Sequence, residues 1–139
     1  LKQLLEIHEK TQSSVLGVFS ASENQVSNYG VISSKNIDGI EKVDGIVEKP
    51  KPADAPSNLA VFGRYILSKD IFLNIEQTKP GLNNEIQLTD AIQDLISNQD
   101  VFALEFEGKR FDCGSKEGYI SAIIDRALSI DKYKSIIEK

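Results

Sequence analysis

Leu59-Ala60-Val61-Phe62-Gly63-Arg64-Tyr65-Ile66-Leu67 is the stretch that decides the fold. Its near-continuous apolar character predicts a strand covered on both faces, as in α/β sheets. Apolar and β-branched runs predict further strands at residues 14–20, 29–33, 40–49 and 101–107. Turn residues at 36–39 predict that the second and third of these pair as a hairpin.

Helical patterns alternate with these strands. An amphipathic helix occupies the N-terminus, and a brief helical turn is predicted at 23–27. Ser68 is the predicted cap of a helix at 69–77, and Thr89 of a helix at 90–98; residues 78–84 form a loop between them. Ser115 opens a helix to about residue 129, and Asp131 begins the last one. The pattern predicts one α/β unit with a mixed sheet and no interdomain linker.

Composition places the chain among ordinary globular domains. Its 139 residues are 40% hydrophobic and 27% charged, with a formal net charge of -5. This acidic balance argues against nucleic-acid or anionic-membrane partners. No apolar run approaches the roughly 20 residues that span a bilayer, and no signal-peptide pattern is present. The single cysteine cannot form an internal disulfide, so a cytoplasmic setting is expected.

The chain starts at Leu1, within a helical pattern, and contains no methionine, so it is expected to be part of a longer protein. His8, the only histidine, shares a helix face with leucines and is expected to be partly buried. Cys113 has no neighbouring base to activate it and is expected to be a small buried residue. One histidine and one cysteine exclude a structural zinc site.

The stretch Asp44-Gly45-Ile46-Val47-Glu48-Lys49-Pro50 brings an acid and a base to the end of an apolar strand. Because Pro50 restricts the residue before it, Lys49 is expected to be extended. Open α/β sheets bind ligands just outside such strand ends. A carboxylate beside an ammonium suits a ligand that carries hydroxyls and phosphate, whereas the alternative is a solvated pair of charges.

Asp112 has two possible roles. It is expected at the end of a short strand, before Gly114 and a helix N-terminus, where it could bind a metal ion. Alternatively, its carboxylate accepts hydrogen bonds from nearby backbone amides. Gly30 marks either a strand start or a place where a ligand approaches the backbone. Glu85, Gln87 and Asp90 have the pattern of polar groups at the start of a helix.

Six short motifs occur together and in order, and they carry a family resemblance. The chain resembles the C-terminal part of bacterial UTP-glucose-1-phosphate uridylyltransferases from about residue 14 to 128. Its motifs are also similar to the wider sugar-phosphate nucleotidylyltransferases, including the glucose-1-phosphate thymidylyltransferases. The motifs are Tyr29-Gly30-Val31-Ile32, Val47-Glu48-Lys49-Pro50, Ala55-Pro56-Ser57-Asn58-Leu59-Ala60-Val61, Gly63-Arg64-Tyr65, Glu85-Ile86-Gln87-Leu88-Thr89-Asp90-Ala91 and Gly108-Lys109-Arg110-Phe111-Asp112-Cys113-Gly114.

The resemblance implies a fold and a reaction. Residues 1–139 would be the C-terminal, sugar-binding half of a Rossmann-like nucleotidyltransferase fold, with a mixed sheet and flanking helices. The whole protein would form UDP-glucose and pyrophosphate from UTP and glucose 1-phosphate. The family's Gly-rich nucleotide loop and its other metal-binding Asp have no counterpart here, so the isolated chain is expected to be inactive, and the base-reading part lies outside it.

The resemblance also assigns roles to single residues. Gly30 would contact the sugar through its backbone, Glu48 would accept hydrogen bonds from glucose hydroxyls, and Val61 would line the sugar pocket. Lys49 would contact the phosphates, and Asp112 would supply one carboxylate to Mg²⁺, which makes these two the catalytic candidates.

A noncatalytic sugar-phosphate-binding or assembly module that keeps the fold stays open as a second function. A thymidylyltransferase-like parent is a third. Half of a parallel sheet would also leave an unpaired edge and an uncovered apolar face, so a homo-oligomer is expected.

Overall fold

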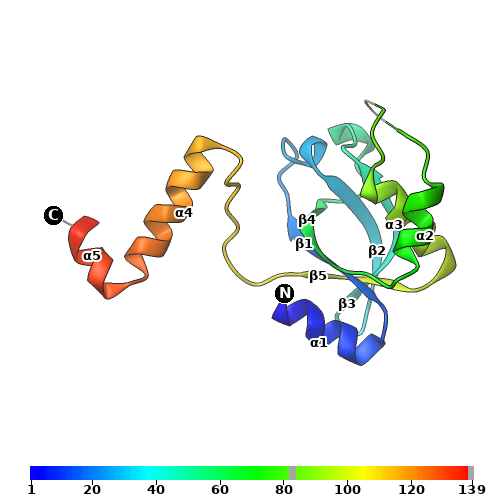
Figure 1. Ribbon diagram of the computed structural model, residues 1–139, viewed down its shortest axis with the longest axis horizontal. Helices are drawn as coiled ribbons and strands as arrows, with labels where there is room; N and C mark the ends of the chain where they lie inside the picture. The colour runs from blue at the N-terminus through cyan, green and yellow to red at the C-terminus, as the bar shows by residue number, and fades with distance from the viewer. Residues whose placement is uncertain (82–83, 138–139) are drawn as a thin grey trace. The chain divides into compact units, whose positions relative to one another are not determined.

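The structure, a computed structural model, describes residues 1–81 and 84–137. It divides into two compact units, Leu1–Phe106 and Glu107–Lys139. The strands and helices of the first unit are coloured from blue to yellow in Figure 1. In chain order they are α1 (Lys2–Thr11), β1 (Ser14–Ser20), the 3₁₀ helix η1 (Val26–Asn28), β2 (Gly30–Ile37), β3 (Ile40–Glu48), the 3₁₀ helix η2 (Pro52–Asp54), β4 (Leu59–Ile66), α2 (Ile71–Gln77), α3 (Leu88–Asn98) and β5 (Val101–Glu105).

The strands of the first unit form a mixed sheet, as predicted. Their order is β1-β4-β2-β3-β5, and β5 pairs again with β1, so the described strands close into a ring. β1 and β5 are parallel, whereas the other pairs are antiparallel. The expectation of an unpaired edge in a half-parallel sheet was therefore wrong. The reason is the long β2–β3 hairpin, whose Glu41 and Lys42 pair with β5 and close the gap.

The two faces of β1 contact different layers. Leu16 and Val18 pack in one cluster with Ile71 of α2 and Ile92 of α3, while Val15 packs with Leu4 and Ile7 of α1. Figure 1 shows α2 and α3 side by side, with α1 apart from them. Because successive side chains of a strand point to opposite faces, helices on both sides bury both faces of β1. The prediction of a buried strand at residues 14–20 is confirmed.

β4 is less covered than its sequence predicted. Ala60 and Val61 are buried, but Gly63 and Arg64 are exposed. The pairing of β4 with β1 shifts register between Leu16 and Val18, and Gly63 has a φ of +75°. The bulge interrupts the pairing only locally, since Tyr65 and Ile66 pair again with β1, and the charged Arg64 side chain reaches solvent at the bulge.

Two of the three predicted helix caps were wrong. α2 and α3 begin at Ile71 and Leu88, and neither has a side-chain cap hydrogen bond. The hydroxyl oxygens of Ser68 and Thr89 are instead buried without a hydrogen-bond partner among the described residues. Ser115 is the confirmed cap, because its Oγ accepts a hydrogen bond from the Gly118 N–H at 3.0 Å.

Of the smaller expectations, some are confirmed, one is confirmed in part and one is wrong. The β2–β3 hairpin is confirmed, with pairing as far as Ile37 and Ile40. His8 is partly buried, with its Nδ1 2.8 Å from the Ser13 carbonyl oxygen. Cys113 is exposed, contrary to expectation. The loop predicted at 78–84 is confirmed at residues 78–81, whereas Asn84 is 3₁₀-helical; residues 82 and 83 lie outside the described residues.

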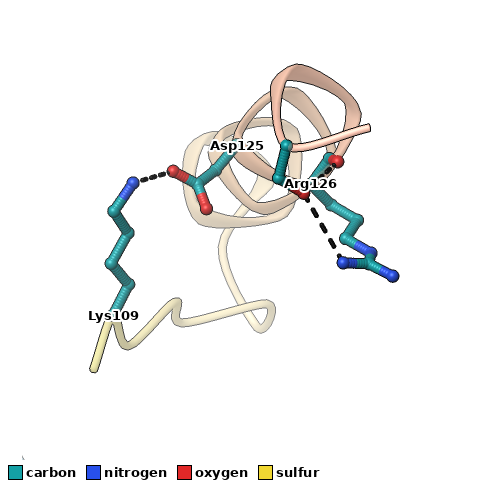
Figure 2. A network of polar contacts seen from close by, with 4 residues as sticks. Lys109, Asp125 and Arg126 are labelled. Carbon is teal, nitrogen blue, oxygen red and sulfur yellow. Dashed lines mark hydrogen bonds and ion pairs between the residues drawn. The ribbon is translucent and has the colours of Figure 1, made fainter. Parts of the chain in front are cut away.

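The second unit holds α4 (Lys116–Leu128) and α5 (Asp131–Ile137), neither of which has a buried described residue. Figure 2 shows Lys109 paired with Asp125 of α4, while Arg126 points to the other side of the helix. The Arg126 guanidinium lies 3.5 Å from the Ser129 hydroxyl. None of the described helices of the chain combines the length and apolar character needed to cross a membrane.

Candidate functional site

The start of β2 and the end of β3 lie opposite each other. Gly30 pairs with Glu48 in the antiparallel ladder, and the Lys49 N–H donates to the Tyr29 carbonyl oxygen at 3.0 Å. β3 ends at Glu48, so the acid and the base leave the strand where the sequence placed them. The ladder thus fixes the backbone of Gly30 beside that of Glu48.

The backbone of Lys49 differs from the prediction. Its φ is +45°, in the left-handed region, instead of the extended conformation expected before Pro50. In this region the Cβ of a non-glycine residue crowds its own carbonyl oxygen, which costs about 1–2 kcal/mol. The Lys49 hydrogen bond to Tyr29 and the fixed φ of the next residue hold this conformation. Strained residues of this kind cluster at ligand-binding sites.

Glu48 and Lys49 differ in exposure. The Glu48 side chain is 17% exposed and that of Lys49 is 55% exposed, with Lys49 Nζ 3.7 Å from Glu48 Oε1. Because Lys49 is more than half exposed, this ion pair contributes only about 0–1 kcal/mol to stability. The alternative prediction from the sequence, a solvated pair of charges, would expose both side chains. The structure instead encloses most of the carboxylate and leaves the ammonium accessible.

Gly30 lies at the centre of a tight cluster of side chains. A Cβ placed on Gly30 would lie 2.8 Å from Thr89 Cγ2, 3.1 Å from Val61 Cγ2 and 3.2 Å from Glu48 Oε2. Three of the predicted site residues, Gly30, Glu48 and Val61, therefore meet within one unit although they come from β2, β3 and β4. The absent side chain of Gly30 first of all allows this close packing.

Thr89 belongs to this cluster, and Tyr65 packs against the hydrophobic core cluster that contains Val61. The sequence assigned neither of them to the site. Thr89 was interpreted as a helix cap, and only its neighbour in space, Gly30, reveals its position. Burial raises the pKa of the Tyr65 phenol, and the negative charge of Glu48 raises it further, against an opposing hydrogen bond with the Gly63 backbone. Both residues lie within motifs that carry the family resemblance, and these motifs were the sequence signal that could have assigned them to the site.

Asp112 lies in the second unit, in a turn and not at the end of a strand. Its Oδ1 accepts a hydrogen bond from the Gly114 N–H at 3.0 Å, and its carbonyl oxygen accepts one from the Ser115 hydroxyl at 3.1 Å. Asp112 thus satisfies backbone and hydroxyl donors at the start of α4, which was the structural alternative. Its role as a metal ligand stays a prediction.

The described residues supply only part of the coordination shell that a Mg²⁺ ion needs. Mg²⁺ prefers six oxygen ligands and is often bound by one or two carboxylates together with substrate phosphates and water. Across residues 1–81 and 84–137, no group of three or more His, Cys, Asp or Glu side chains forms a metal site. Asp112 offers one carboxylate, whose Oδ1 already accepts the hydrogen bond from Gly114.

Comparison with known families decides the class of the protein. Residues 1–127 match the family model described as nucleotidyl transferase. The chain belongs to the nucleotidyl transferase family. Its mixed sheet with flanking helices is the fold expected from the resemblance. The family match covers the whole first unit, including Gly30, Glu48, Lys49 and Val61, and continues into α4.

Curated relatives of this nucleotidyl transferase chain carry a more specific name. It is 46% identical over 135 residues to UTP–glucose-1-phosphate uridylyltransferase 2 of Streptococcus pyogenes serotype M3, covering 96% of the chain and 45% of the relative. It is 47% identical to a UTP–glucose-1-phosphate uridylyltransferase of Streptococcus pyogenes, covering 96% and 44% respectively. The chain therefore spans about half the length of the curated relatives it matches.

Solved structures confirm the fold. A UDP-glucose pyrophosphorylase complexed with UDP-glucose is 45% identical, with a TM-score of 0.87 over 93% of this chain and 49% of that one. UTP-bound UGPase from Acinetobacter baumannii is 34% identical, with a TM-score of 0.81 over 99% and 49%. A putative glucose-1-phosphate thymidylyltransferase from Bacillus anthracis shares the fold at 22% identity, with a TM-score of 0.66 over 87% and 46%.

Proposed function

We propose that this chain is the C-terminal, sugar-binding part of a cytoplasmic UTP-glucose-1-phosphate uridylyltransferase. The whole protein forms UDP-glucose and pyrophosphate from UTP and glucose 1-phosphate. The observation that carries the proposal is the meeting of Gly30, Glu48 and Val61, with the Glu48 carboxylate enclosed and the Lys49 ammonium exposed beside it. The relatives named for this activity support it.

Each of these side chains has a role that its surroundings permit. The Glu48 carboxylate only accepts hydrogen bonds, so it suits the hydroxyl groups of a hexose. Because it is largely enclosed, water competes less for it than for a surface carboxylate. Val61 presents a methyl group beside the Gly30 backbone and suits the apolar face of the sugar ring. Tyr65 packs against the hydrophobic cluster that contains Val61.

Lys49 is proposed to bind the phosphate. In the reaction, an oxygen of the sugar phosphate attacks the α-phosphorus of UTP, and pyrophosphate leaves. The protein mainly positions the reactants and offsets the charge of the phosphates, so a fixed cation contributes directly. The left-handed backbone of Lys49 directs where its side chain leaves the strand end. Asp112 is proposed to give one ligand to Mg²⁺, which when bound would neutralise phosphate charge.

The proposal is tested by kinetics of the full-length protein that carries this chain. Glu48→Ala is expected to raise KM for glucose 1-phosphate by about tenfold or more, because charge-assisted hydrogen bonds contribute roughly 1.5–3 kcal/mol. KM for UTP should change far less. Glu41→Ala is the matched control, since Glu41 lies at the other end of β3. Equal losses for both substrates would contradict the role of Glu48.

Two other functions predict different results. A noncatalytic sugar-phosphate-binding module would bind glucose 1-phosphate but form no UDP-glucose, even as the full-length protein. A thymidylyltransferase-like protein would use dTTP in preference to UTP. The purified 139-residue chain is expected to form no UDP-glucose in either case. Substantial synthesis by it would contradict the proposal that it holds only the sugar-binding half of the active site.

A homo-oligomer is the remaining part of the proposal. Its supporting observation is the second unit, where Tyr119, Ile120, Ile123 and Ile124 of α4 are each at least 44% exposed. Apolar surfaces of this kind are characteristic of interaction sites. Light scattering of the full-length protein is expected to give a mass above that of the monomer, and a monodisperse monomer would contradict it.

A further inference from the structure

Helix α3 touches the candidate sugar site at two points. The Thr89 methyl group lies over Gly30 at the start of β2, within 2.8 Å of the position of an added Cβ. Gln93, one turn further along α3, accepts a hydrogen bond from the Ile46 N–H of β3 at 2.8 Å from its Oε1. Residues four apart share one face of a helix, so a single face of α3 contacts both strands of the hairpin.

The contact with Ile46 lies on the edge of β3 that faces away from β2. Ile46 pairs with Ile32, and the alternation of hydrogen-bonded pairs set by the Lys49 bond to Tyr29 points the Ile46 N–H outward from the hairpin. Among the described residues, β5 pairs with β3 only near its start, so no strand reaches this N–H. The Gln93 side chain supplies its hydrogen-bond partner from the helix and so holds the last residues of β3 in place.

The contact with Gly30 has a different character. Thr89 is 7% exposed, and its hydroxyl oxygen is buried without a hydrogen-bond partner among the described residues. A buried hydroxyl without a partner is unfavourable, so hydrogen bonding does not explain a threonine here. Its methyl group, in contrast, contacts the glycine that pairs with Glu48. The methyl is the part of Thr89 that serves the site.

We propose that the first turns of α3 support the sugar-binding end of the β2–β3 hairpin, with Thr89 and Gln93 as positioning residues for Gly30 and Glu48. This inference rests on the proposed function and adds two residues to it. Neither side chain needs to touch the sugar. Thr89 sets how closely the helix approaches Gly30, and Gln93 fixes the direction in which β3 delivers Glu48.

A size-swap experiment in the full-length protein tests the Thr89 contact. Gly30→Ala is expected to lower the melting temperature and to raise KM for glucose 1-phosphate, because its Cβ overlaps the Thr89 methyl. Thr89→Ser deletes that methyl and is expected to recover most of both losses in the double variant. Thr89→Val keeps a methyl and is the matched control, which should recover neither. Equal behaviour of the two double variants would overturn the inference.

The Gln93 contact is tested by Gln93→Leu, with Asp94→Ala on the exposed side of α3 as the control. An unpaired Ile46 N–H is expected to raise KM for glucose 1-phosphate about fivefold, with KM for UTP nearly unchanged. A rise in both values, or in neither, would refute positioning by Gln93. A full-length protein that forms no UDP-glucose would refute the proposed function and, with it, the role of Gln93 in sugar binding. The melting temperatures of the size-swap variants need no substrate, so they would still show whether Thr89 packs against Gly30.

Discussion

Replacing Lys49 with glycine and with alanine separates two properties of this residue, its charge and its backbone conformation. Both variants remove the ammonium and the ion pair with Glu48. Only Lys49→Gly also removes the Cβ that makes a φ of +45° unfavourable. The comparison of the two variants therefore isolates the backbone strain at the strand end, because the lost ion pair cancels between them.

The magnitude follows from two opposing effects. Relief of the left-handed conformation stabilises Lys49→Gly by about 1–2 kcal/mol. The greater freedom of glycine in the unfolded chain offsets about 0.5–1 kcal/mol of this. Lys49→Gly should therefore exceed Lys49→Ala in free energy of unfolding by about 0.5–1 kcal/mol, which corresponds to a rise of about 1–4 °C in melting temperature.

Thermal and urea unfolding of the full-length protein measure this difference, and binding of glucose 1-phosphate measures its functional counterpart. Both variants are expected to bind the sugar phosphate more weakly than the wild-type protein, since both lack the cation. A stability of Lys49→Gly equal to or below that of Lys49→Ala would refute the strained backbone. Unchanged affinity in both variants would refute the contact of Lys49 with phosphate.

Three further predictions follow from single side chains. Hydrogen bonds from Ser34 and Asn36 lower the pKa of Glu41 in the folded state, so the stability they provide is present above the ordinary carboxyl pKa of about 4.3 and is lost as pH falls below it. The difference in melting temperature between wild type and Glu41→Gln should therefore shrink as pH falls through the carboxyl pKa. A difference that stays constant with pH would count against the lowered pKa. Burial and Glu48 raise the pKa of Tyr65, so above about pH 10 the unfolded chain releases the phenol proton first and stability falls; Tyr65→Phe should show a shallower alkaline decline, whereas identical curves would exclude the shift. Ser115→Ala should destabilise α4 by about 1 kcal/mol in amide hydrogen exchange, with Ser115→Asn as a control that keeps the cap.

The sequence predicted the local elements well because their signals are local. The strand at 14–20 matches β1, and Ser115 caps α4, because apolar periodicity and capping depend on residues close together in the chain. The strand predicted at 40–49 is β3, which ends one residue earlier, at Glu48; the break before Pro50 was predictable because proline cannot continue a ladder. The family resemblance added the expectation that Gly30, Glu48 and Val61 act together.

Tertiary contacts decided what the sequence could not. Pro50 alone favours an extended Lys49, but the hydrogen bond to Tyr29 accompanies a left-handed one. Thr89 has the sequence pattern of a cap, but packing against Gly30 places it inside α3. Closure of the sheet likewise depends on β3 reaching β5. In each case the deciding partner is distant in sequence or fixed by the fold, so local propensity carries no information about it.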